Sequence, residues 1–251
     1  MAAEGRAGAE EAGRELRFAT THWSAVLAAG HPASPQAREA LETLCRTYWY
    51  PLYAYVRRRG YRQEDAEDLV QGFFLHLLRG EILATITREG GHFRSFLLGT
   101  LKHFLSDQSD KAAAQKRGGG QQFVSWELAT AEQRFIREPV DDQSPDRLFE
   151  RGWALTLLER ALARLREQCG AQGKAELFTQ LKSFVLGEKG PMSYAEAAAQ
   201  VGLSPSALKS AIFRLRRQYH ELVREEVRHT VADPREVEEE LRHLLAVFSG
   251  R

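Results

Sequence analysis

Cysteine is scarce in this sequence, and its two copies stand far apart. Cys45 and Cys169 are the only cysteines among 251 residues, and they form no CxxC pair. This argues against a disulfide framework and against a zinc site built on paired cysteines. Free thiols are typical of a reducing compartment, so we expect a cytoplasmic protein.

Long apolar runs and familiar catalytic signatures are also missing. No uninterrupted apolar stretch is long enough to span a bilayer, and the first residues lack both an apolar signal core and a basic leader, so we expect neither export nor membrane contact. The glycines at 118–120 follow Lys116 and Arg117 instead of preceding a Lys-Ser or Lys-Thr pair, and neither HExxH nor GxSxG occurs. We therefore expect no enzyme activity, no catalytic residues, no cofactor and no metal site.

A strong net charge is absent as well, because 35 basic residues nearly balance 34 acidic ones. The useful quantity is thus the local charge, which changes sign along the chain. The hydrophobic content of 43% is sufficient for one large or two small cores.

Helical periodicity predicts an all-α fold with two small helical domains, joined by a flexible linker, of which the second contains a helix-turn-helix. Residues 1–17 are rich in Ala, Gly and Glu and predict a disordered tail. The first domain covers residues 18–117, the linker 118–147, the second domain 148–228 and an amphipathic C-terminal extension 229–251. The linker is assigned because its sequence has no sustained periodicity and contains Pro139 and Pro145.

Within the first domain we expect a short helix after Thr20 and a longer one broken or kinked at Pro51. Further helices begin at Gln63 and near Phe93. In the second domain helices follow from Pro145 and from Ala175, and a last helix begins at Asp233-Pro234. The apolar stripe of that last helix contains Val237, Leu241, Leu244, Leu245 and Phe248. We expect it to dock on the second domain, and the alternative is that it binds a separate protein.

The segment 193–217 carries the strongest motif, because two short helical patterns meet there across a tight turn. Gly202 ends the first pattern, and Ser204 and Pro205 supply the N-cap and first residue of the second. Leu208, Ile212 and Leu215 lie on the apolar stripe of this second helix. Its other side carries Ser206, Lys209, Ser210, Phe213, Arg214 and Arg217.

Between Pro205 and His220 the sequence contains four Lys or Arg residues and no Asp or Glu. Such a local excess of positive charge suits a phosphate backbone, and helices of this kind place Arg, Lys and Ser at base edges in the major groove. The alternative is an ordinary helical hairpin with a solvated basic face.

Two further surfaces are candidates in the first domain. The run Glu64, Asp65, Asp68, Leu69 and Gln71 gives a helix an acidic first turn, which fits either a solvated face or a docking surface for a partner helix. The helix after Phe93 combines aromatic and polar side chains that suit single-stranded nucleic acid, although an aromatic stripe on its own is more often part of a core. These side chains are Arg94, Phe96, Lys102, His103 and Gln108.

Taken together, residues 38–228 resemble the extracytoplasmic-function type of bacterial RNA polymerase sigma factor. The motifs that carry the resemblance are the segment 65–71, the segment 93–97 with Lys102 and His103, and the segment 206–210 with Arg214, Arg216 and Arg217. Their order, with an unpatterned linker between them, is more specific than any one of them.

The resemblance implies a role for each candidate surface. Core RNA polymerase would bind Glu64, Asp65, Asp68, Leu69 and Gln71. The opened strand of the downstream, minus-ten promoter element would meet Arg94, Phe96, Lys102, His103 and Gln108, and the duplex of the upstream, minus-thirty-five element would meet the exposed side of the helix after Pro205. Core polymerase and promoter DNA are thus the expected partners, with an anti-sigma factor as a further candidate.

Two other classes of protein share some of these features. A free-standing helix-turn-helix regulator would bind duplex DNA as a dimer through the same helix, with the first domain as a sensor. A nuclease would use the acidic residues 64–68 to hold a divalent metal, although no His stands at ligand spacing beside them.

Overall fold

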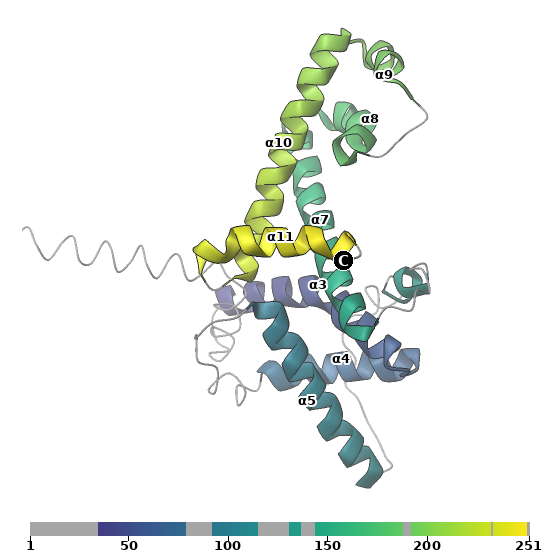
Figure 1. The fold of residues 1–251 in the computed structure, drawn as a ribbon, viewed down its shortest axis with the longest axis vertical. Helices are drawn as coiled ribbons and strands as arrows, with labels where there is room; N and C mark the ends of the chain where they lie inside the picture. The colour runs from purple at the N-terminus through teal and green to yellow at the C-terminus, as the bar shows by residue number, and fades with distance from the viewer. Residues whose placement is uncertain are drawn as a thin grey trace, which may run out of the picture. The chain divides into compact units, whose positions relative to one another are not determined.

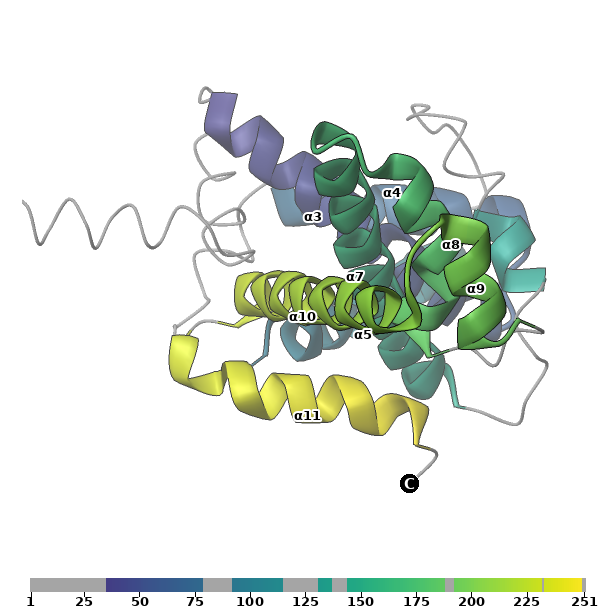
Figure 2. The same ribbon diagram turned by 90° about the horizontal axis from the view of Figure 1, so that it is seen from above.

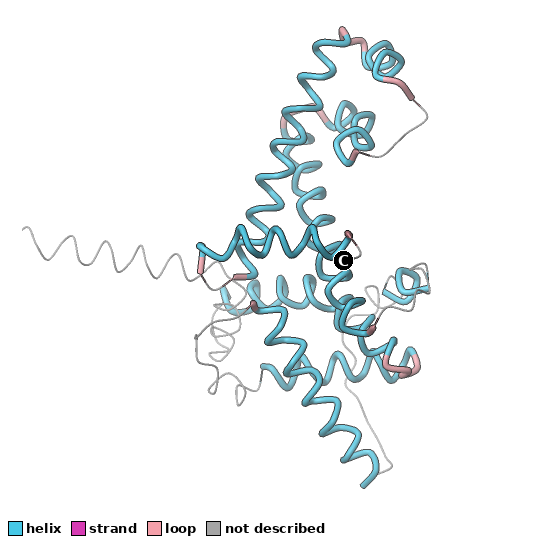
Figure 3. Tube along the Cα trace, in the orientation of Figure 1, coloured by secondary structure: helices cyan, strands magenta, loops and turns pink. Residues whose placement is uncertain are grey.

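The computed structural model describes residues 35–78, 92–114, 131–136, 144–187, 192–231 and 233–249. Every regular element in these ranges is a helix, which confirms the all-α fold class (Figure 3). The predicted tail 1–17, the helix expected after Thr20 and the linker stretches 118–130 and 137–143 lie outside the described residues.

The chain divides into two compact units (Figure 1). Unit 1 contains Met1–Ala154 and Arg228–Arg251, and unit 2 contains Leu155–Val227. The division falls inside two long helices, α7 (Pro145–Ala171) and α10 (Pro205–Thr230). The C-terminal extension therefore belongs to the same unit as the first helices of the chain, so the expectation that it docks on the second domain is wrong.

Aromatic side chains form the core of unit 1, which begins with α3 (Pro35–Arg58), α4 (Gln63–Leu78) and α5 (Phe93–Ala114). Tyr48 of α3 meets Phe93 of α5 with ring centroids 5.3 Å apart, and Phe73 of α4 meets Phe104 of α5 at 5.7 Å. These four rings are all buried, and each belongs to the apolar positions predicted for its own helix. The stripe of α5 is therefore largely core.

Pro51 lies inside α3 and does not end it, so of the predicted break or kink the break is wrong. A proline in a helix interior costs about 3 kcal/mol, because a hydrogen bond is lost and the ring crowds the preceding turn. Its neighbours Tyr50, Leu52 and Tyr53 are buried, and burial of each such side chain contributes roughly 1.5–3 kcal/mol. Packing therefore outweighs the local preference. The site is tight, since a Cβ on Gly152 of α7 would lie 3.3 Å from the α-carbon of Pro51.

Residues 131–136 form a short helix within the predicted linker and pack on the end of α3. Glu132 accepts two hydrogen bonds from Arg57, at 2.8 and 3.0 Å, and a third from the hydroxyl of Tyr53. Phe135 lies under the Arg57 guanidinium, 5.0 Å from its Cζ to the ring centroid. This part of the linker is thus fixed to unit 1, which the sequence did not predict because six residues are too few to show a period.

Unit 2 consists of the rest of α7 with α8 (Ala175–Leu186), α9 (Tyr194–Val201) and most of α10. These helices begin where the sequence predicted. Figures 1 and 2 both show α8 and α9 beside the first turns of α10. The buried side chains of the unit include Leu157, Leu165, Phe178, Leu181, Leu208, Ile212 and Leu215.

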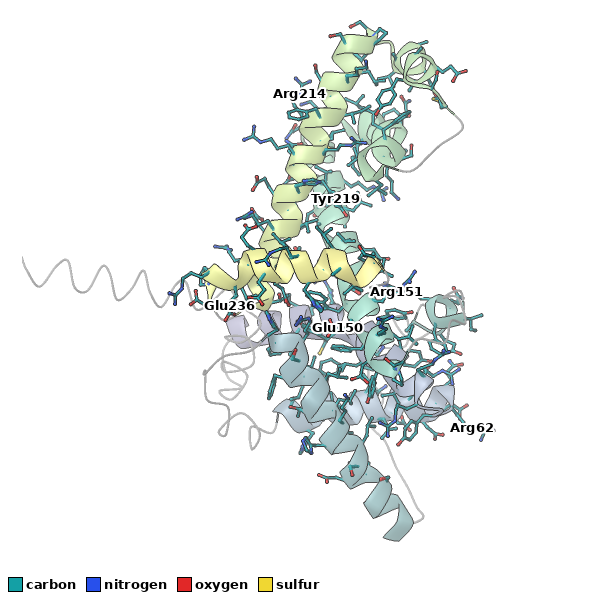
Figure 4. The ribbon with its side chains drawn as sticks, in the orientation of Figure 1. Arg62, Glu150, Arg151, Arg214, Tyr219 and Glu236 are labelled. Atoms are coloured by element: carbon teal, nitrogen blue, oxygen red, sulfur yellow. The ribbon has the colours of Figure 1, made fainter. Side chains whose placement is uncertain are left out.

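A buried carboxylate joins α7 to α10 within unit 2. Glu226 accepts hydrogen bonds from Arg160 at 2.8 Å and from Arg164 at 3.0 Å. Earlier on α10, the Tyr219 hydroxyl donates to the Leu158 carbonyl at 3.2 Å (Figure 4), and burial raises the pKa of this hydroxyl to about 12. These contacts fix the axial register of α10 against α7.

The C-terminal extension contains a 3₁₀ turn, η2 (Pro234–Glu236), and α11 (Val237–Phe248). Asp233 accepts a hydrogen bond from the Arg235 N–H at 2.9 Å, which confirms the predicted start of this helix. Val237 and Leu244 are buried as predicted, but Leu245 is 65% exposed and Phe248 is 40% exposed, while Glu240 is fully buried. None of the helices in the described ranges combines the length and apolar character needed to cross a bilayer.

Candidate nucleic-acid interface

The junction of α9 and α10 is built from local capping interactions. At the start of α9, Ser193 Oγ accepts from the Glu196 N–H at 3.2 Å, and Glu196 accepts from the Ser193 N–H at 2.7 Å. This reciprocal pair is a capping box, which the sequence analysis missed. At the other end Gly202 has a φ of 71°, a left-handed conformation that glycine adopts without steric cost. Shortly afterwards Pro205 begins α10.

α8 supports this junction from the side. The rings of Phe184 and Tyr194 lie 5.1 Å apart and join α8 to α9. Arg216 of α10 donates two hydrogen bonds, at 2.7 and 3.1 Å, to the Phe184 carbonyl in the last turn of α8. Carbonyls in the last turn of a helix lack an intrahelical partner of the usual kind, so the guanidinium helps to satisfy this one. Arg216 therefore has a structural position, and its charge does not contribute to the outer face of α10.

All six predicted duplex-binding residues lie on the solvent side of α10. Each of them is exposed, whereas Leu208, Ala211, Ile212 and Leu215 on the opposite side are buried. In Figure 4 Arg214 lies on the side of α10 away from α8. We call this surface the α10 outer face, and it consists of Ser206, Lys209, Ser210, Phe213, Arg214 and Arg217.

Charge and shape make the α10 outer face different from an ordinary solvated helix. Among the described residues, Lys209, Arg214 and Arg217 form no ion pair, and the first acidic residue on the helix is Glu221. Phe213 stands among them with 69% of its surface exposed. An exposed aromatic ring between unpaired cations suits a surface that meets both phosphates and base edges.

The first turns of α4 carry the acidic candidate surface. Glu64, Asp65 and Asp68 are exposed, and Leu69 and Gln71 are partly exposed. The buried side of this part of the helix is formed by Ala66 and Val70. All five predicted polymerase-binding residues are thus accessible on one short helix, and we call them the α4 acidic face.

The predicted strand-binding residues of α5 do not form one open surface. His103 is exposed, and Phe96 and Gln108 are partly exposed. Lys102 is exposed but forms an ion pair with Asp146 of α7. Arg94 is only 4% exposed, so the prediction that it lies at the surface is wrong in this structure.

Arg94 is enclosed by acidic and aromatic groups of unit 1. Its Nε donates to Glu150 at 3.0 Å, and its Cζ lies 5.1 Å from the ring centroid of Trp153. Glu240 of α11 approaches its Nη2 to 3.2 Å. Arg94 follows the first residue of α5 and lies beside the buried stripe, so the C-terminal helix that covers it was beyond prediction from the local pattern.

Two charged residues, Arg216 of the recognition-helix motif and Glu240, have structural positions that were not predicted, although a signal was present for both. Arg216 stands four residues after Ile212, at the border of the apolar stripe of α10. Glu240 stands three residues after Val237 and four before Leu244, which places it within the apolar stripe of α11. A charged residue at a core position of a helical period is a candidate for a buried pair.

No three His, Cys, Asp or Glu side chains in the described part of the chain gather as a metal site. Comparison with protein-family models, with curated proteins and with solved structures finds no match for this chain.

Proposed function

We propose that this protein is a promoter-recognition subunit of bacterial RNA polymerase, similar to the extracytoplasmic-function sigma factors. The observation that carries the proposal is the α10 outer face, where six polar, basic and aromatic side chains are exposed on a helix whose position is set by α7 and α8. In this proposal α9 and α10 form the helix-turn-helix of a second domain, and the protein acts in the cytoplasm without a cofactor.

The α10 outer face would enter the major groove of the upstream promoter element with its N-terminal residues. Arg214 and Lys209 suit guanine, and Ser210 suits several bases, with each good bidentate pair worth about 1–3 kcal/mol of discrimination. Exposed Phe213 suits the methyl group of thymine. Arg217, farther along the helix, suits a backbone phosphate.

The first domain would supply polymerase binding and contact with the opened strand. The α4 acidic face is accessible and presents three exposed carboxylates within five residues, Glu64 to Asp68. Its charge suits a basic partner surface on the polymerase. On α5, Phe96 and His103 would stack on or contact the bases of the opened strand, since unstacked bases bind aromatic side chains.

A co-purification experiment with core RNA polymerase tests the proposal. The tagged full chain is compared with an Asp65→Lys, Asp68→Lys variant, which reverses the charge of the α4 acidic face. We expect core polymerase to be retained by the wild-type chain and lost with the variant, because like charges across a contact cost several kcal/mol. A Glu167→Lys, Glu176→Lys variant, with the same change of net charge at two exposed residues of unit 2, should retain the polymerase.

The absence of polymerase binding by the folded wild-type chain would contradict the sigma-factor proposal. A free-standing helix-turn-helix regulator would then be favoured, because it needs only the α10 outer face and duplex DNA. Loss of binding in both charge-reversal variants would contradict the assignment of the contact to α4.

A further inference from the structure

The start of α5 is covered by the C-terminal helix α11, and the contact centres on Arg94. Arg94 Nε donates to Glu150 of α7 at 3.0 Å, and Nη2 lies 3.2 Å from Glu240 Oε2 of α11. His243 of α11 completes the cluster, with Nε2 2.8 Å from the same oxygen of Glu150. Residues 92, 94, 150, 240 and 243 all belong to unit 1. Figure 4 labels Glu150 close to α11.

Few apolar side chains of α11 are buried where this helix docks. Val237 and Leu244 are its buried apolar side chains, while Leu245 and Phe248 remain exposed. The remaining buried residue is Glu240. Hydrophobic burial therefore stabilises this helix much less than it stabilises α3, α4 or α5.

The buried polar groups of this contact do not all have hydrogen-bond partners. Neither oxygen of Glu240 receives a hydrogen bond of good geometry from the described residues, although Arg94 and His92 approach to 3.2 and 3.0 Å. Burial, reinforced by the charges of Glu150, Glu236 and Glu239, raises the pKa of Glu240 to about 7 against the opposing effect of Arg94. A buried carboxyl without full partners opposes docking, so α11 is poised to detach.

We infer that α11 is a reversible cap, and that single-stranded DNA reaches Arg94 only after α11 has left the start of α5. This inference rests on the proposed function of α5. The competition has a clear chemical basis, since a phosphate oxygen would replace the Glu240 carboxylate at Nη2 while Nε stays with Glu150. The docked cap also holds the Glu240 carboxylate beside Arg94 at this end of α5, where its charge repels a phosphate backbone.

Full-length variants can open the cap in two independent ways. Glu240→Arg places a second cation against Arg94, and Leu244→Ser removes a buried apolar side chain from the other part of the contact. Glu240→Gln keeps the shape of the side chain and removes its buried charge, so the cap should stay closed. Glu239→Arg is the matched control, because it makes the same charge change at an exposed position of α11.

Two measurements are made on each variant. Hydrogen exchange followed by mass spectrometry reports the protection of the amides of α11 and of the first turns of α5. Fluorescence anisotropy with a labelled, random-sequence pool of single-stranded DNA reports strand affinity. We expect Glu240→Arg and Leu244→Ser to lose protection in α11 and to bind the strand about tenfold more tightly, because closure of the cap reduces apparent affinity in proportion to the open fraction. Glu239→Arg should behave like the wild-type chain, and Glu240→Gln should show neither a loss of α11 protection nor a gain in strand affinity.

Loss of α11 protection without any gain in strand affinity would overturn the inference, as would a gain in Glu239→Arg equal to that in Glu240→Arg. Absence of strand binding in every variant would overturn it too. Retention of core polymerase, measured on the same variants, does not depend on the cap and so distinguishes failure of the inference from failure of the proposed function.

Discussion

Two neighbouring arginines of α10, Arg216 and Arg217, lie in opposite environments. Arg216 lies against α8 and donates both of its hydrogen bonds to the Phe184 carbonyl, while Arg217 extends into solvent. Their adjacent positions in the sequence differ by about 100° around the helix, which is enough to separate a structural residue from a surface residue.

This difference predicts separable effects of the same substitution. Arg216→Gln should lower the free energy of unfolding of the chain by about 1–3 kcal/mol, because a charge-assisted contact to a backbone carbonyl is lost. Arg217→Gln should change it by less than about 0.5 kcal/mol. On a random-sequence duplex, Arg217→Gln should also reduce the slope of log affinity against log salt by about 1, since one phosphate contact is removed.

Urea unfolding and a salt titration of duplex binding, done on both variants, check this prediction. An unfolding free energy that falls equally in the two variants would show that Arg217 is also structural. An unchanged salt slope in Arg217→Gln would remove this residue from the proposed interface.

At the scale of the elements, glycine at the end of α9 determines how the chain turns into α10. The N–H of Gly202 bonds to the Ala199 carbonyl at 3.2 Å and that of Leu203 to the Ala198 carbonyl at 2.9 Å, which closes the helix end. A φ of 71° is required at Gly202 for this geometry. No heavy atom lies within 4 Å of a Cβ built there, so only the backbone conformation restricts this position.

We therefore predict opposite effects for two glycine substitutions. Gly202→Ala should lower the free energy of unfolding by about 1–2 kcal/mol, because the left-handed conformation is unfavourable for a residue with a Cβ. Gly170→Ala, in the last turn of α7, should raise it by about 0.5–1 kcal/mol, since alanine favours the helix and its Cβ meets no other atom. Thermal or urea unfolding of the two variants checks the signs, and a stabilising Gly202→Ala would contradict the assigned turn geometry.

Helix positions were also the feature of the structure that the sequence predicted best. Long periodic stretches such as α7 and α10 have strong repeats of apolar residues and a proline at the first position, so their starts at Pro145 and Pro205 were predicted correctly. α3 is not broken at Pro51, because the burial of the neighbouring side chains outweighs the local preference of proline. The helix at 131–136 was missed because its stability comes from Arg57 and Tyr53, which are distant in the sequence.

The candidate site shows the same limit. The exposed residues of α10 follow from one helical period, so all six were placed on the correct side. The burial of Arg94 depends on Glu150 and Glu240, which approach from two other helices. The helical repeat of apolar residues in α11 shows that one of its faces is buried, but it does not show which part of the chain that face packs against.

At the scale of the molecule, the C-terminal extension couples the stability of unit 1 to pH through Glu240. Its folded pKa of about 7 lies above the usual value of 4.5. Between pH 4.5 and about 7, the Glu240 carboxyl therefore keeps its proton in the folded chain and has lost it in the unfolded chain. Stability falls as the pH rises through this interval, and the loss is complete above a pH of about 7. His92 acts in the opposite sense, since burial and Arg94 lower its pKa and its contribution is lost as the pH falls.

A comparison of the full chain with its Glu240→Gln variant isolates this effect, because His92 is present in both. The other groups that face Glu240 are also unchanged by the substitution, namely Arg94, Glu150, Tyr48, Glu236 and Glu239, as is His243, which pairs with Glu150. At about pH 5 the two chains should have the same urea midpoint, since Glu240 is protonated in the folded state. At about pH 8 the variant should be the more stable one, because the wild-type chain then buries a negative charge beside Glu150.

Urea midpoints measured at intervals from about pH 5 to about pH 8 check this prediction, with Glu167→Gln, at an exposed position of α7, as the control that should follow the wild-type chain at every pH. A constant difference between the wild type and Glu240→Gln would mean that Glu240 is ionised throughout and that Arg94 holds it as a stable ion pair. α11 would then be a permanent part of unit 1. A difference that grows with pH ties the closed state of α11 to a protonated Glu240, so that neutral pH is where the helix begins to be released readily from Arg94.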